Sequence, residues 1–305
     1  MKYSFLSQAE QGRNDVWRYF CGILLVMLFS LVGFYWIGVP MSRGLAAAGV
    51  SVDDLLYANK PEEKIKHLLA HSLQNSYLST HVAYAFLSMG IFVAVKLLHQ
   101  RKMLTLISPD ATFQLKRFGL GFGVWFAIAS VQTLIEFLYN RTAFIWNFQP
   151  SVWLAFLPWA IVCTPIQTTA EELLFRGYFL QGLGCLTRQP TVLAIASSLP
   201  FAIAHFGNPE MGRGAEWVAL TYLLMGIFLV LITLKDDRLE LALGVHAANN
   251  LFVVLIVNTQ DSVLPTPALI MQQIPSDPRF TIVALLSGIA IFYGLVFWPH
   301  RRPDE

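Results

Sequence analysis

Charge and cysteine are both scarce in this chain. Only 13% of its 305 residues are charged, and the formal net charge is +2. No basic tract of the kind that binds nucleic acid is present, and no acidic tail, so we expect no nucleic-acid partner. Cys21, Cys163 and Cys185 lie in or beside apolar segments without C-x-x-C spacing. This pattern argues against a disulfide framework and against a thiolate metal site.

Hydrophobic residues, in contrast, are abundant. They make up 55% of the chain, and the mean hydropathy is +0.55. They come in blocks of about 20, which is the length of helix that crosses a bilayer. The sequence therefore predicts an all-α, polytopic membrane helix bundle with about eight transmembrane helices. The expected spans are Tyr19 to Val39, Tyr77 to Leu98, Phe118 to Tyr139, Val152 to Leu183, Thr191 to Phe206, Glu216 to Leu234, Leu239 to Asn258, and Phe280 to Trp298.

The first block is interpreted as a retained span. The run from Tyr19 to Val39 lacks the small-residue cleavage pattern of a signal peptide. The longest polar stretch follows it, from Met41 to Asn75, where a solvated connector with short interfacial helices is expected and a gating role is the alternative. No internal repeat, low-complexity tract or domain-splitting linker interrupts the chain, so we expect a single membrane domain over residues 1–305.

The distribution of Lys and Arg predicts the orientation in the membrane. The two termini and every second loop carry 12 of these residues, and the intervening loops carry 7. Because positive charge accumulates on the cytoplasmic side, both termini are expected in the cytoplasm.

The fourth block is the longest. Val152 to Leu183 spans 32 residues, roughly 48 Å of helix against a hydrocarbon core of about 30 Å. It must tilt, bend or extend past the membrane. Pro158 and Pro165 can each kink it.

Two adjacent carboxylates and an arginine stand near the end of this block. Glu172 and Arg176 are four residues apart and share a helical face, whereas Glu171 points about 100° away. Arg176 can thus neutralise Glu172 and leave Glu171 free. Ionisable residues at membrane depth are rare and usually functional. An interfacial ion pair is the alternative interpretation.

Two later segments add polar groups of catalytic type. Phe201 and His205 end the fifth apolar block, and His246 and Asn250 share a face of the seventh, with Asn249 beside them. A carboxylate and an imidazole can hold and deprotonate water, while a second imidazole and an amide can donate to an oxyanion. The same histidines and a glutamate could instead bind zinc, although no H-E-x-x-H motif is present.

These residues resemble a known family. Glu171-Glu172-x-x-x-Arg176, Phe201-x-x-x-His205 and His246-x-x-x-Asn250 are similar to the three motifs of the CAAX-processing and bacteriocin-processing (CPBP) intramembrane endopeptidases, of the type II CAAX prenyl endopeptidase kind. The resemblance covers roughly residues 164–252, within a motif-bearing core of about 152–258.

The resemblance implies a helix bundle around an intramembrane cavity, with proteolysis by a glutamate-activated water. Glu171 would be the general base, and His205 would help to position the water. His246 and Asn250 would form the oxyanion site, supported by Glu172, Arg176, Phe201 and Asn249. Asn249 duplicates the amide of Asn250, and the polar Gln167-Thr168-Thr169 stretch would line the cavity.

The sequence therefore predicts an intramembrane endopeptidase without a cofactor. It would cleave a membrane-associated peptide or protein tail in a bilayer, which we expect to be a bacterial inner (plasma) membrane. The alternatives are a zinc-dependent intramembrane metalloprotease and a non-proteolytic scaffold or immunity-type protein. A proton-coupled transporter is a further alternative, but no inverted repeat supports it.

Overall fold

The computed structural model describes residues 4–47, 77, 80–273 and 276–298. Helices dominate, as predicted. In chain order, the helical elements are η1 (Leu6–Gln11), α1 (Val16–Ala47), the Thr80–Leu98 helix that ends in the π-helical turn η2 (Ala94–Leu98), η3 (Met103–Leu106), α4 (Leu115–Tyr139), η4 (Arg141–Ala143), α5 (Pro150–Glu172), the π-helical η5 (Leu173–Phe179), α6 (Leu180–Gly184), α7 (Pro190–Ala204), η6 (Pro209–Arg213), α8 (Ala215–Asp236), α9 (Glu240–Leu255) and α10 (Pro278–Phe297).

Six of the described helices are long and apolar enough to cross a membrane. They are Val16–Trp36 within α1, Thr80–Leu98, α4, the continuous Pro150–Gly184 segment, α8 and α10. The protein is thus a multi-pass membrane protein. The predicted count of eight is not confirmed, because the fifth and seventh predicted spans correspond to α7 and α9, which have only 15 and 16 residues. The expected interfacial helices of the polar connector fall mostly in residues 48–76, outside the described part of the chain.

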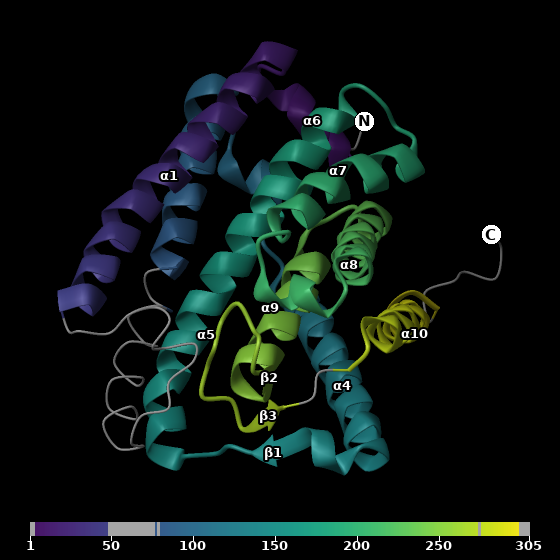
Figure 1. Ribbon diagram of the computed structural model, residues 1–305. Coiled ribbons are helices and arrows are strands. Elements are labelled where there is room, and N and C mark those ends of the chain that lie inside the picture. The colour runs from purple at the N-terminus through teal and green to yellow at the C-terminus, as the bar shows by residue number, and fades with distance from the viewer. Residues whose placement is uncertain (1–3, 48–76, 78–79, 274–275, 299–305) are drawn as a thin grey trace.

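Helix α9 lies at the centre of the bundle. It packs against α4, α5 and α8, which surround it in Figure 1, and most of its side chains are buried. Glycines allow the closest of these contacts. A Cβ atom on Gly244 would lie 2.2 Å from the Phe118 carbonyl oxygen, and one on Gly121 would lie 2.4 Å from that of Leu241. Side chains at either position would push α4 and α9 apart.

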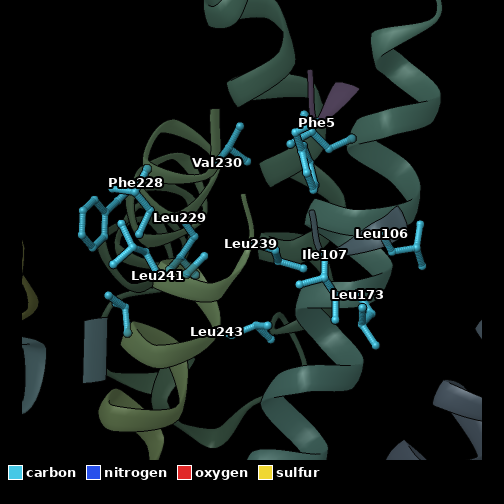
Figure 2. Close-up of a cluster of buried hydrophobic side chains, with 14 of the residues drawn as sticks. Phe5, Leu106, Ile107, Leu173, Phe228, Leu229, Val230, Leu239, Leu241 and Leu243 are labelled. Carbon is cyan, nitrogen blue, oxygen red and sulfur yellow. The ribbon is translucent and has the colours of Figure 1, made fainter. Parts of the chain in front are cut away.

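The largest hydrophobic cluster joins α8 and α9 to the start of the chain and to the α5–η5 junction. This cluster includes Phe228 and Leu229 of α8, Leu241 of α9, Phe5 and Leu173, which are labelled in Figure 2. All five side chains are buried. The N-terminal segment is therefore part of the core. Its backbone is also held by a hydrogen bond from the Phe5 N–H to Asp237 Oδ1 at 2.7 Å.

A small sheet was not predicted. Strand β3 (Ile270–Gln272) pairs antiparallel with β1 (Phe144–Trp146) and parallel with β2 (Val257–Thr259). The predicted seventh helix, Leu239 to Asn258, is therefore wrong at its end, because Val257 and Asn258 are extended. The returning chain explains the change, since the N–H groups of Leu269 and Ile270 bind the carbonyls of Leu255 and Ile256 at the end of α9.

Candidate active site

The acidic pair lies where α5 changes from α-helix to π-helix. Glu171 and Glu172 are the last residues of α5, and the π-helical η5 begins at Leu173 and contains Arg176. Single π-helical turns within α-helices are rare and occur frequently at functional sites. The whole Pro150–Gly184 segment has 35 residues, and both Pro158 and Pro165 lie inside α5.

Glu172 binds two cationic or polar partners with one oxygen. Its Oε1 atom accepts from Arg176 Nη1 at 2.9 Å and from His246 Nδ1 at 2.7 Å. Glu172 and Arg176 are fully buried, and His246 is 4% exposed. The predicted Glu172–Arg176 pair is confirmed. The contact with His246 was not foreseen, and it fixes the imidazole with Nδ1–H toward the carboxylate.

Glu171 is buried on the other side of the same histidine. Its Oε2 atom lies 3.8 Å from His246 Nε2, and its Oε1 accepts from Gln167 Nε2 at 3.3 Å. Within the described residues, Oε2 has no hydrogen-bond partner. The Oε2 atom of Glu172 likewise has no hydrogen-bond partner among the described residues, so the two glutamates differ in the partners of Oε1: Arg176 and His246 bind that of Glu172, and the neutral amide of Gln167 binds that of Glu171.

The Phe201 ring contacts the guanidinium of Arg176 and the imidazoles of His205 and His246. The guanidinium of Arg176 lies 4.3 Å from the ring centroid, a cation–π distance. The rings of His205 and His246 lie 4.6 Å and 6.0 Å from the same centroid. Phe201 therefore holds together three groups from three different segments. Gly226 lets α8 approach them, and its carbonyl accepts from Arg176 Nη2 at 3.4 Å.

His205 caps the C-terminal end of α7. Its Nδ1 lies 2.7 Å from the carbonyl oxygen of Phe201, which can only accept, so Nδ1 carries the hydrogen. In the neutral ring, Nε2 is then an acceptor. Tyr222 stacks on the ring at 4.2 Å, and Asn208 donates to the Tyr222 hydroxyl at 3.0 Å. Glu171 is among the charged neighbours of His205.

Trp125 determines how the two asparagines are oriented. The indole Nε1–H can only donate, so the Asn249 atom 3.3 Å away is its Oδ1. The Asn249 amide nitrogen then donates to Asn250 Oδ1 at 3.2 Å. This chain leaves the amide hydrogens of Asn250 for another acceptor. Asn250, rather than Asn249, is thus the free donor on the His246 face of α9.

Comparisons with known proteins identify the family of this chain. A family model described as type II CAAX prenyl endopeptidase Rce1-like matches residues 150–252. The chain is 31% identical over 300 residues to a Bacillus subtilis (strain 168) protein named "Uncharacterized protein YyaK", with 98% of this chain and 97% of the relative covered. The chain belongs to the Rce1-like family. No solved structure matches. At the level of the family, this protein is an intramembrane endopeptidase of the CAAX type.

The two histidines of this Rce1-like site are each held by a hydrogen bond at one ring nitrogen. No three His, Cys, Asp or Glu side chains in the described part of the chain are arranged to hold a metal ion. His246 uses Nδ1 to bind Glu172, and His205 uses Nδ1 to bind its own helix.

Two residues that border the site are not part of the three sequence motifs and were not predicted. His81 and Tyr84, on the Thr80–Leu98 helix, both have Gln167 and Glu171 as neighbours. They lie outside residues 150–252, which the family model matches. The available signal was a spacing, because Tyr77, His81 and Tyr84 recur at four and three residues in an apolar span.

Proposed function

We infer that the protein is a glutamic intramembrane endopeptidase, in which Glu171 activates the water that attacks a peptide bond. The observation that carries this inference is that the two glutamates have different hydrogen-bond partners. Glu172 is held by Arg176 and His246, whereas Glu171 is held only by the neutral amide of Gln167 and has a free oxygen 3.8 Å from His246 Nε2. A base needs such a free oxygen.

Water binding is assigned to Glu171 and His205. Glu171 Oε2 and the Nε2 atom of neutral His205 are both acceptors, and a water molecule has two hydrogens to donate. Glu171 takes one proton as the water oxygen forms a bond to the carbonyl carbon, whose π electrons move to the oxygen. Glu171 later returns the proton to the amide nitrogen as the C–N bond breaks. The immediate products are a carboxylic acid and an amine, and transfer of the acid's proton to the amine gives the carboxylate and the ammonium group.

The oxyanion that develops is assigned to His246 and Asn250. With Nδ1–H donated to Glu172, a doubly protonated His246 ring donates Nε2–H to the oxyanion. The free amide hydrogens of Asn250 supply the second donor. Preorganised donors of this kind stabilise the transition state, and removal of one typically costs 10²- to 10³-fold in kcat.

The proposed substrate is a membrane-associated peptide or protein tail. Three segments that carry the site, Pro150–Gly184, α8 and the Thr80–Leu98 helix, are long and apolar enough to span a bilayer. The proposed setting is a bacterial plasma membrane with both termini in the cytoplasm. It is supported by the bacterial relative and by the distribution of Lys and Arg.

The test is cleavage of a peptide library that includes prenylated C-terminal CAAX peptides. Purified full-length protein in detergent is compared with Glu171→Gln, which keeps the size of the side chain but cannot act as a base. We expect cleavage by the wild type and none by the variant. Full turnover by a folded Glu171→Gln variant would contradict the mechanism.

A further inference from the structure

Three pairs of polar side chains join the second span to α5. The pairs are Tyr77 with Thr164, His81 with Gln167, and Tyr84 with Glu171. The three residues of the second span are separated by four and then three positions, and their three partners on α5 by three and then four. Such spacing places each set on one face of a helix. The second span therefore presents a polar face directly to the segment that carries the proposed base.

The tautomer of His81 follows from its first contact. Its Nδ1 atom lies 2.6 Å from the carbonyl oxygen of Tyr77, which can only accept, so Nδ1 carries a hydrogen. His81 is 2% exposed, and its Nε2 has no hydrogen-bond partner in the part of the chain that the structure describes. The ring is thus anchored at one nitrogen, and the other nitrogen is buried beside Gln167.

Gln167 is oriented by Glu171. Because a carboxylate accepts, the Gln167 atom 3.3 Å from Glu171 Oε1 is the amide nitrogen. The amide oxygen of Gln167 is buried and has no partner among the described residues. His81 and Gln167 are neighbours, and His81 Nε2 and Gln167 Oε1 are both acceptors without a partner among the described residues, so a hydrogen donor between them would satisfy both atoms. Because the ring carries its hydrogen on Nδ1, a bridging water that donates one hydrogen to each atom supplies this link.

We propose that His81 is a positioning residue of the active site, which acts on Glu171 through Gln167. His81 holds the amide oxygen of Gln167, so that the amide nitrogen binds Glu171 Oε1 and leaves Oε2 to bind water. This role rests on the proposed function of Glu171. It uses a residue of the second span, outside the three motifs.

Two substitutions separate positioning from a merely structural role. In His81→Asn, the amide can replace Nδ1 at the Tyr77 carbonyl but does not reach Gln167. In His81→Gln, the amide reaches the position of Nε2. We expect His81→Asn to lower kcat about 10-fold with KM unchanged, because one positioning hydrogen bond is lost, and His81→Gln to stay within about 3-fold of wild type. The opposite order would assign His81 to the Tyr77 contact and overturn the proposal.

A double-mutant cycle tests the route through Gln167. Gln167→Ala and the His81→Asn, Gln167→Ala double variant should have the same kcat, since both break one chain of contacts. Additive losses would overturn the proposal. The same cycle measured on the thermal unfolding midpoint requires no substrate, and an absence of coupling there would also contradict the contact. His99→Asn is the matched control, because His99 also binds a backbone carbonyl through Nδ1 but lies outside the site.

Wild type and Glu171→Gln are assayed together with these variants. Cleavage that Glu171→Gln abolishes but His81→Asn leaves unchanged would contradict this inference alone. Cleavage that Glu171→Gln leaves intact would contradict the proposed base, and with it the role of His81.

Discussion

His246 and Arg176 bind the same oxygen atom of Glu172, at 2.7 Å and 2.9 Å. One buried carboxylate thus links a guanidinium of the η5 segment to an imidazole of α9. In the mechanism proposed above, His246 is an oxyanion donor. The ion pair that stabilises the bundle and the orientation of that donor therefore depend on a single side chain.

Arg176→Ala should strongly reduce the amount of folded protein. It would leave Glu172 buried without its counter-charge, and breaking a buried pair in this way costs about 3–5 kcal/mol. Thermal unfolding and yield in detergent are the measurements. Arg188→Ala is the control, because Arg188 forms an exposed ion pair with Glu10, worth about 0–1 kcal/mol. Equal unfolding midpoints for the two variants would show that the buried pair is not structural.

Gly226→Ala should also destabilise the protein. The added Cβ would lie 2.8 Å from Ser198 Cβ and 3.4 Å from Arg176 Nη2. Overpacking of this kind costs about 1–3 kcal/mol. Gly123→Ala in α4 is the matched control, because no atom lies within 4 Å of its added Cβ. We expect the control to unfold at or above the wild-type temperature, since alanine favours a helix over glycine. A Gly226→Ala variant as stable as the control would count against close packing of α8 on Ser198 and Arg176.

The two asparagines of α9 should differ sharply in mutant kinetics. Asn250→Ala removes the proposed oxyanion donor and is expected to lower kcat roughly 10²- to 10³-fold. Asn249→Ala removes only the hydrogen bond that orients Asn250, so its effect should be about 5-fold, equivalent to about 1 kcal/mol. Single-turnover assays on folded variants measure both. A larger effect at Asn249 would reverse the assignment.

The buried imidazole of His99 should make the folded protein less stable at acidic pH. Burial lowers the pKa of His99 from 6.5 to about 4 and outweighs the hydrogen bond from its Nδ1 to the Arg13 carbonyl, which raises the pKa. The Nε2 atom accepts from Tyr178 at 2.7 Å. Between these values the unfolded state binds a proton that the folded state does not bind, so stability falls as the pH falls through this range. Unfolding midpoints measured from pH 7 to pH 4 should decrease more for wild type than for His99→Asn. Parallel curves for the two proteins would contradict this role for His99.

The motifs predicted the partners that lie close in sequence. Glu172 and Arg176 are one helical turn apart, so their pairing follows from helix geometry. The contact of His246 with Glu172 joins residues 74 positions apart, and only the packing of α9 on α5 reveals it. His81 was missed for the same reason, because one histidine in an apolar span carries no information about which helix it faces.

Hydropathy predicted the helices well and their ends less well. Apolar composition does not distinguish a helix from the short strand β2, and residues 257–259 are extended because β3 pairs with them. The lengths of α7 and α9 depend on where the chain turns. They have 15 and 16 residues and are shorter than the six helices that are long enough to cross a membrane, although their sequences are as apolar.

The central claim is that Glu171 is the base and that no metal is required. The most direct measurement is peptide-library cleavage by wild type and Glu171→Gln, each with and without a strong zinc chelator. The account predicts cleavage that survives the chelator and is absent in the variant. Cleavage that is lost to the chelator and restored by zinc would contradict the account, and so would full turnover by Glu171→Gln.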